Sequence, residues 1–96
     1  MAKADPRLKI PAGLPDDVKD WNTDDVKIFL GENTKDYEFN EGDIQMIKDH
    51  RVNGRHLLRY EEEAFRACGV PVGPATDIFD LVMELKIAKG LVVSGK

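Results

Sequence analysis

The sequence predicts an all-α fold, a compact bundle of five helices that ends in a long C-terminal helix. Apolar residues recur at helical spacing in several stretches, and residues typical of helix starts and ends separate those stretches. No pattern typical of a β-hairpin occurs. With 42% hydrophobic and 33% charged residues, the 96-residue chain is expected to be globular and to bury one modest core.

The chain is expected to form one domain with less ordered ends. Residues 1–13 contain two prolines and no apolar periodicity, which predicts a flexible N-terminal tail. The helical domain is expected over residues 14–90, and residues 91–96 are expected to fray. Near its start, Pro15 and two aspartates favour a single helical turn that leads to Trp21, the only tryptophan and a candidate core anchor.

The first two helices have recognisable start signals. The first is expected to begin at Thr23, whose hydroxyl can cap it, and to end near Gly31. The second is expected to follow Asn40, because an asparagine with an acidic residue three positions later, Asp43, is typical of a capping box. This second helix should run to about residues 49–50.

Two short helices are expected next. Asn53 can cap a third helix of barely two turns. Three glutamates after Tyr60 favour the first turn of a fourth helix, because negative charge interacts well with the N-terminal end of the helix dipole. Gly69, followed by an apolar residue and a proline, is typical of the end of that helix.

The fifth helix is expected to open with Pro74, to cover residues 75–89 and to stop at Gly90. Apolar residues on the inward faces of all the helices are expected to share one core. The predicted core consists of Trp21, Val26, Phe29, Leu30, Ile44, Ile47, Val52, Leu57, Leu58, Phe65, Val70, Ile78, Leu81, Val82 and Leu85.

Composition and motifs argue against several function classes. A net charge of −4 argues against sequence-blind nucleic-acid binding, which needs a positive surface. The single cysteine, Cys68, cannot form an intramolecular disulfide and no apolar run approaches bilayer length, so we expect an intracellular, cytoplasmic protein with no membrane association. His50 and His56 with Cys68 fit no zinc spacing, and no nucleophile–base set or phosphate loop occurs. We therefore expect no metal, no cofactor and no enzymatic activity.

The order of these features resembles the SAM (sterile alpha motif) domain over roughly residues 14–88. The matching residues are Trp21-Asn-Thr-Asp-Asp-Val26 with Phe29-Leu30, the pair Ile44 and Ile47, Val52-Asn-Gly54 with Leu57-Leu58, Phe65 with Gly69-Val70, Gly73-Pro74, and the run from Ile78 to Leu85. The spacing of the Gly-Pro-Ala junction before the last helix is similar to that in SAM domains of fungal signalling-type proteins. The resemblance implies a non-catalytic protein interaction module that binds other SAM domains or itself.

The resemblance also implies two binding surfaces, since a mid-loop surface of one SAM domain docks on an end-helix surface of another. Carried over by position, the mid-loop surface consists of Lys48, Asp49, Arg51, Arg55, Tyr60, Glu61, Glu62 and Glu63. The end-helix surface consists of Val72, Gly73, Pro74, Ala75, Thr76, Asp77 and Asp80. The implied role is self-association, as a head-to-tail oligomer, or heterotypic SAM–SAM binding, within a larger signalling or scaffold protein.

The charges depart from the usual arrangement of polymerising relatives, which have an acidic mid-loop and a basic residue near the start of the last helix. Here residues 48–59 carry four basic residues against one acidic, a net charge of +3, and the last helix starts with Asp77 and no basic residue before Lys86. We therefore hypothesise reversed polarity, although Glu61–Glu63 place acid beside the basic residues. The alternative is RNA-hairpin or other phosphate-backbone binding through residues 48–59. RNA-binding relatives, however, carry basic residues where this chain has Asp77.

Overall fold

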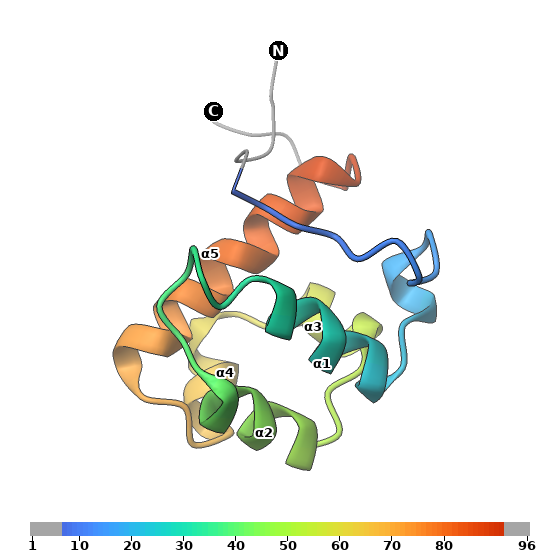
Figure 1. Cartoon of the computed structure of the whole chain (residues 1–96). Coiled ribbons are helices and arrows are strands. Elements are labelled where there is room, and N and C mark those ends of the chain that lie inside the picture. Colours follow the sequence, from blue (N-terminus) through green and yellow to red (C-terminus); the bar gives the residue numbers. More distant parts are fainter. Residues whose placement is uncertain (1–6, 92–96) are drawn as a thin grey trace.

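A computed structural model describes residues 7–91 as five α-helices preceded by one turn of 3-10 helix, with no β-strand in that range (Figure 1). The elements in chain order are η1 (Val18–Asp20), α1 (Thr23–Glu32), α2 (Glu41–Asp49), α3 (Gly54–Arg59), α4 (Glu62–Ala67) and α5 (Val72–Ala88). The predicted all-α, five-helix class is confirmed. Residues 1–6 and 92–96 lie outside the described part, and with them most of the C-terminal stretch that was expected to fray.

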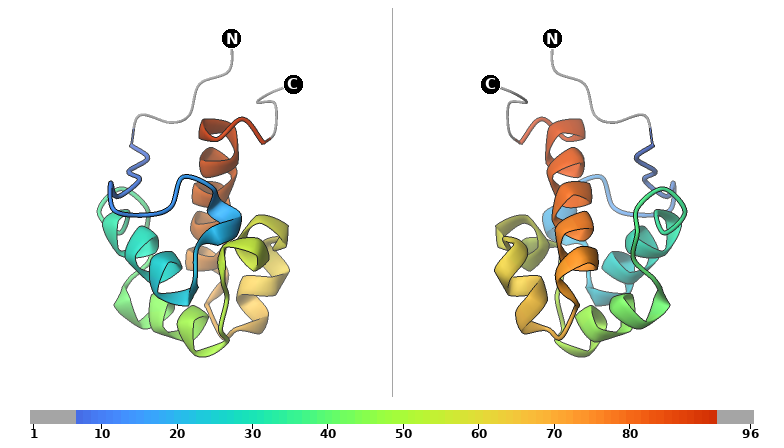
Figure 2. Two further views of the ribbon diagram at one scale, coloured as in Figure 1. Left: turned by 90° about the vertical axis from the view of Figure 1, so that its right-hand side faces the viewer. Right: turned by 90° about the vertical axis from the view of Figure 1, so that its left-hand side faces the viewer.

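The long helix α5 runs along one side of the bundle, and the shorter elements gather beside it (Figures 1 and 2). Helix α4 packs chiefly on α5, α1 packs on α2, and η1 packs on α3. The C-terminal end of α2 and the α4–α5 connection lie at the bottom of Figure 1, and the segment that precedes η1 crosses the upper part of the bundle. The bundle therefore has two distinct ends.

The interior is one apolar cluster to which every helix contributes. Trp21 packs against Phe29 with ring centroids 5.2 Å apart, and Phe65 brings α4 into the same core. Fully burying one large apolar side chain stabilises a fold by roughly 1.5–3 kcal/mol. Of the expected core residues, Leu58 is half-buried and the others are buried. Buried apolar residues outside the predicted core set are Val18, Tyr37, Phe39, Cys68 and Ala75.

Three helices begin with the same reciprocal cap. At α2 the side chain of Asn40 accepts a hydrogen bond from the backbone N–H of Asp43, whose carboxylate accepts one from the N–H of Asn40, both at 3.0 Å, as predicted. The predicted cap of α3 at Asn53 is also confirmed. Helix α1, however, is capped by Asn22 and not by the expected Thr23, because Asn22 has extended backbone and Thr23 is already helical.

Left-handed glycines end α4 and α5. Gly69 has a φ of +103°, and the N–H groups of Gly69 and Val70 donate to the carbonyls of Arg66 and Phe65 at 2.9 and 3.3 Å. Gly90, with a φ of +72°, ends α5 in the same way. Glycine adopts this conformation without a Cβ clash, which is why both predicted stops are confirmed.

Two helix boundaries differ from the prediction. Helix α1 continues through Gly31 to Glu32, because a glycine inside a helix costs only about 1 kcal/mol and does not by itself end it. Helix α5 begins at Val72 and not at Pro74, because Pro71 already stands before the first turn in extended backbone. Pro74 is tolerated in that first turn, where the missing N–H has no intrahelical partner to lose.

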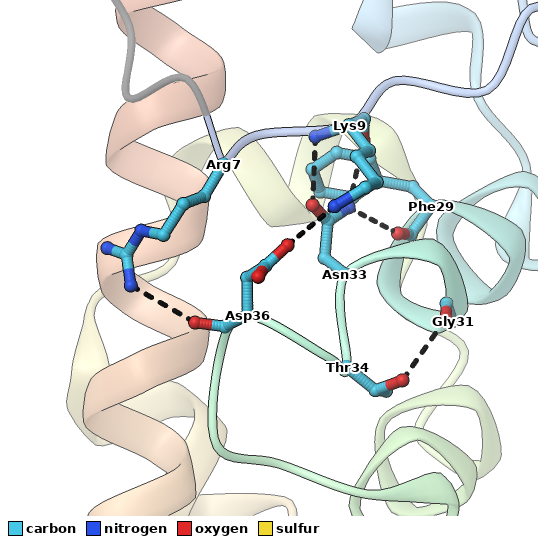
Figure 3. Close-up of polar contacts among 7 residues, drawn as sticks. All are labelled: Arg7, Lys9, Phe29, Gly31, Asn33, Thr34 and Asp36. Atoms are coloured by element: carbon cyan, nitrogen blue, oxygen red, sulfur yellow. Dashed lines mark hydrogen bonds and ion pairs between the residues drawn. The ribbon is translucent and has the colours of Figure 1, made fainter.

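Residues 7–9 pack against the α1–α2 loop, which differs from the expected flexible tail over residues 1–13 (Figure 3). The side chain of buried Asn33 bonds both the N–H and the C=O of Lys9. The two residues are 24 positions apart, so no local pattern in the sequence announces the contact. Residues 1–6 of the expected tail lie outside the described residues.

Helix α3 approaches η1 so closely that only glycine fits at its first position. A Cβ on Gly54 would lie 1.7 Å from the carbonyl oxygen of Val18 and 2.9 Å from the Cβ of Trp21. The N–H of Gly54 donates to the carbonyl of Trp21 at 2.9 Å, and the indole Nε1 donates to the carbonyl of Pro15 at 2.8 Å. The chain before α1 is thereby fixed on α3.

We expect Gly54→Ala to destabilise the domain by roughly 3 kcal/mol, because the clash is with backbone and no side-chain rotation relieves it. Chemical denaturation of both proteins measures the difference. Gly31→Ala is the control, since a Cβ there meets nothing within 4 Å inside α1. That substitution should stabilise the domain by roughly 0.5–1 kcal/mol. Equal effects of the two substitutions would contradict the packing described.

Candidate functional site

Three arginines form an exposed basic patch, defined as Arg51, Arg55 and Arg59. Arg55 and Arg59 are one helical turn apart on α3. Arg51 ends α2 with a φ of 56°, a left-handed conformation that is rare for a residue other than glycine. Among residues 7–91 no carboxylate is within ion-pair distance of these three side chains. Their charges are therefore available to a partner.

Two charged residues of the mid-loop surface, Lys48 and Asp49, are engaged within the domain, whereas Glu61 and Glu63 are exposed. Lys48 pairs with Asp24 of α1 at 3.1 Å, and Asp49 accepts a hydrogen bond from Gln45 at 2.8 Å. Tyr60 is half-buried, stacks near His56 with ring centroids 5.8 Å apart and meets Phe65 edge-on at 5.8 Å. Tyr60 thus connects α3 to α4, which is a structural role.

Only some residues of the end-helix surface are exposed to solvent. Val72 is 59% exposed and a Cβ on Gly73 would meet nothing within 4 Å, so this turn is open to a partner. Ala75 is fully buried, because it lies on the side of α5 that faces the core. The expectation that Ala75 contacts a partner is therefore not met. Thr76 is half-buried and bonds the carbonyl of Val72 at 3.0 Å.

Four carboxylates of α4 and α5 form an acidic patch, defined as Glu62, Asp77, Asp80 and Glu84. Loss of solvent around the carboxyl, and then repulsion from Asp77, Glu62 and Glu84, raise the pKa of Asp80 above its ordinary value of 3.8. Asp80 and Glu84 are one helical turn apart and so neighbour each other on α5, and Val72 lies about two turns before Asp80.

The sequence divided this patch between two surfaces. Glu62 was assigned to the mid-loop surface with Glu61 and Glu63, but its electrostatic coupling is to Asp80 of α5. Glu84 was not assigned to any surface. The packing of α4 on α5 brings Glu62 together with the carboxylates of α5. In the sequence, the only signal available for Glu84 was its position one helical turn after Asp80 on α5.

Other kinds of site find little support in residues 7–91. No group of three His, Cys, Asp or Glu in that range is placed to hold a metal ion. Burial raises the pKa of the Cys68 thiol, which disfavours the reactive thiolate. The pocket between η1 and the end of α5 has a volume of about 230 Å³, below the usual size of small-molecule sites. No helix between residues 7 and 91 is both long and apolar enough to cross a bilayer.

A comparison with protein families decides what this arrangement belongs to. The family described as SAM-like domain matches residues 5–84, most of the chain. The chain belongs to the SAM-like domain family. SAM-like domains are generally non-catalytic protein interaction modules, and membership supports that role for this SAM-like domain. No curated protein and no solved structure matches the chain.

We expect Asp80→Asn to stabilise this SAM-like domain at neutral pH, because the substitution removes a carboxylate that has lost solvent and is repelled by its neighbours. Since the folded-state pKa is raised, the unfavourable contribution is present above that pKa. It disappears as the pH falls through it towards 3.8 and below. Thermal unfolding of both proteins between pH 7 and pH 3 checks the trend. Asp16→Asn, an exposed aspartate outside the acidic patch, is the control. A gap that widens at low pH would contradict the assignment.

Proposed function

We propose that this SAM-like domain is a protein interaction module that self-associates head to tail, with the basic patch of one copy on the acidic patch of the next. The observation that carries the proposal is the gathering of four carboxylates around Asp80, whose pKa is raised by loss of solvent and then by repulsion from the other three. The three arginines of the same domain lack an ion-pair partner among the described residues. A guanidinium beside Asp80 would relieve the repulsion. Binding would thereby recover free energy that is lost in the isolated domain.

The positions of the two patches favour an open assembly. The basic patch lies after α2 and on α3, and the acidic patch lies on α4 and α5. In Figure 2, η1 and α3 face the viewer in one view, and α5 faces the viewer in the opposite view. Two complementary patches on different sides of one molecule cannot satisfy each other within that molecule. They produce head-to-tail contacts, which form open chains unless the rotation between copies closes a ring.

The contact would combine charge with a small apolar element. Val72 and the open Gly73 lie about two turns before Asp80 on α5, where a partner helix could approach closely. Complementary charges mainly set association rate and specificity, so we expect modest affinity. Exposed charges are screened over about 10 Å at 0.1 M salt, so the affinity should fall as salt is raised. The same surfaces could serve a different SAM domain in a signalling or scaffold protein.

Two charge reversals on opposite patches test the proposal. Arg55→Glu destroys the basic patch and keeps the acidic one, whereas Asp80→Lys does the reverse. We expect each variant alone to be monomeric in sedimentation velocity at concentrations where the wild type grows in mass. An equimolar mixture should form a one-to-one complex through the two patches that remain intact. Lys35→Glu, an exposed lysine on the α1–α2 loop, is the charge-matched control and should assemble as the wild type does.

Several outcomes would overturn the proposal. A wild type that stays monomeric at all concentrations and salt levels would exclude self-association, and a mixture that forms no complex would exclude the head-to-tail pairing. The variant Ala75→Glu is not suitable for this purpose, because a buried glutamate would unfold the domain. RNA binding through residues 48–59 stays a prediction, which filter binding of an RNA hairpin at increasing salt tests directly.

A further inference from the structure

The α1–α2 loop holds the backbone of residues 7–9 in a way that local caps do not explain. Asn33 is fully buried, and its Oδ1 accepts a hydrogen bond from the N–H of Lys9 at 2.9 Å. Its Nδ2 donates to the C=O of Lys9 and to the C=O of Phe29, both at 2.8 Å. One side-chain amide thus satisfies both polar groups of one residue of an extended segment, as a neighbouring strand would (Figure 3).

The side chains on either side of this backbone contact are also bound. The ammonium of Lys9 pairs with the carboxylate of Asp36, and the guanidinium of Arg7 donates to the backbone carbonyl of Asp36 at 3.1 Å. The same guanidinium lies 4.8 Å from the centre of the Tyr37 ring. Leu8, between the two basic residues, is half-buried against the core.

These contacts together have the composition of a peptide-recognition site. The amide of Asn33 binds the backbone. The Asp36 carboxylate and the Tyr37 ring contact the two cationic side chains at alternate positions, and the apolar residue between them packs on the core. Alternation of this kind is what an extended segment presents to a surface. A buried amide that would lose two hydrogen bonds without its ligand is a specific feature of such a site.

We propose that the α1–α2 loop is a binding site for an extended basic peptide of the pattern Arg-apolar-Lys, and that residues 7–9, here called the strap, are its resident ligand. The occupant that can replace the strap is an Arg-apolar-Lys segment of another protein. Residues 10–17 connect the strap to η1 without helix or strand, so the strap can leave without unfolding an element. The site lies towards the top of Figure 1, away from α2 and α4 at the bottom.

The strap competes with any incoming peptide. Because it is tethered by a short segment, its effective concentration at the site is on the order of millimolar. A peptide added to the intact chain must overcome that concentration. Substitution of the strap's own basic side chains weakens the competitor, because only its backbone bonds to Asn33 and the packing of Leu8 are kept, and it leaves Asn33, Asp36 and Tyr37 in place.

The test uses the full 96-residue chain with an opened site, Arg7→Ala combined with Lys9→Ala. The probe is a fluorescent peptide with the sequence of residues 5–12, followed by anisotropy. We expect it to bind the opened chain at least tenfold more tightly than the wild type. Adding Asp36→Ala to the opened chain should weaken binding at least tenfold, and a probe with Lys9→Glu should bind equally poorly. Adding Lys35→Ala, at the neighbouring exposed lysine, should change nothing.

Asn33→Ala is the more direct variant, but Asn33 also bonds the carbonyl of Phe29 at the end of α1, so its loss can unfold the helix terminus. Asp36→Ala keeps the test decisive, because within residues 7–91 the Asp36 carboxylate pairs with Lys9 of the strap and with no other side chain. Equal affinity for opened and wild-type chains would overturn the proposal. So would binding that is insensitive to Asp36→Ala, or no binding to the opened chain at millimolar probe. None of these outcomes depends on self-association through the basic and acidic patches.

Discussion

The contact between the first residue of α3 and the turn η1 fixes the geometry on which the rest of the domain depends. Because glycine has no side chain, the backbone of Gly54 can approach η1 closely, and its N–H donates to the carbonyl of Trp21. Trp21 in turn carries the packing to Phe29 of α1. Helix α3 has only six residues, which is too little surface to fix its own orientation. The contact with η1 therefore sets the direction in which Arg55 and Arg59 project from the bundle.

The net charge of −4 conceals a separation of charge that the fold creates. Four carboxylates gather on α4 and α5, where loss of solvent and then mutual repulsion raise the pKa of Asp80, while three arginines lie after the end of α2 and on α3. A domain selected for stability alone would gain from exchanging one of these carboxylates. The separation is physically consistent with an interaction module whose two sides are satisfied only by another molecule, whether a second copy or a heterotypic partner.

Local chemistry made much of the fold predictable, and tertiary packing hid the remainder. The cap at Asn40 and the stop at Gly69 follow from a few neighbouring residues, so the sequence located both. The burial of Ala75 depends on the rotation of α5 against the core, and the coupling of Glu62 to that helix depends on how α4 packs. Asn33 contacts a segment 24 residues away. No periodicity or capping pattern in a single sequence indicates a contact between residues so far apart in the chain. The binding surfaces were therefore predicted less well than the helices.

A head-to-tail contact would change the surroundings of the two patches as the protein concentration rises. Backbone amide shifts followed by NMR from dilute to concentrated solution locate self-contacts without any substitution. We predict progressive shifts in two separate groups, around Arg51, Arg55 and Arg59 and around Val72, Asp77 and Asp80, both reduced by salt. Spectra that do not change with concentration, or shifts confined to one of the two groups, would contradict a head-to-tail contact between the basic and acidic patches.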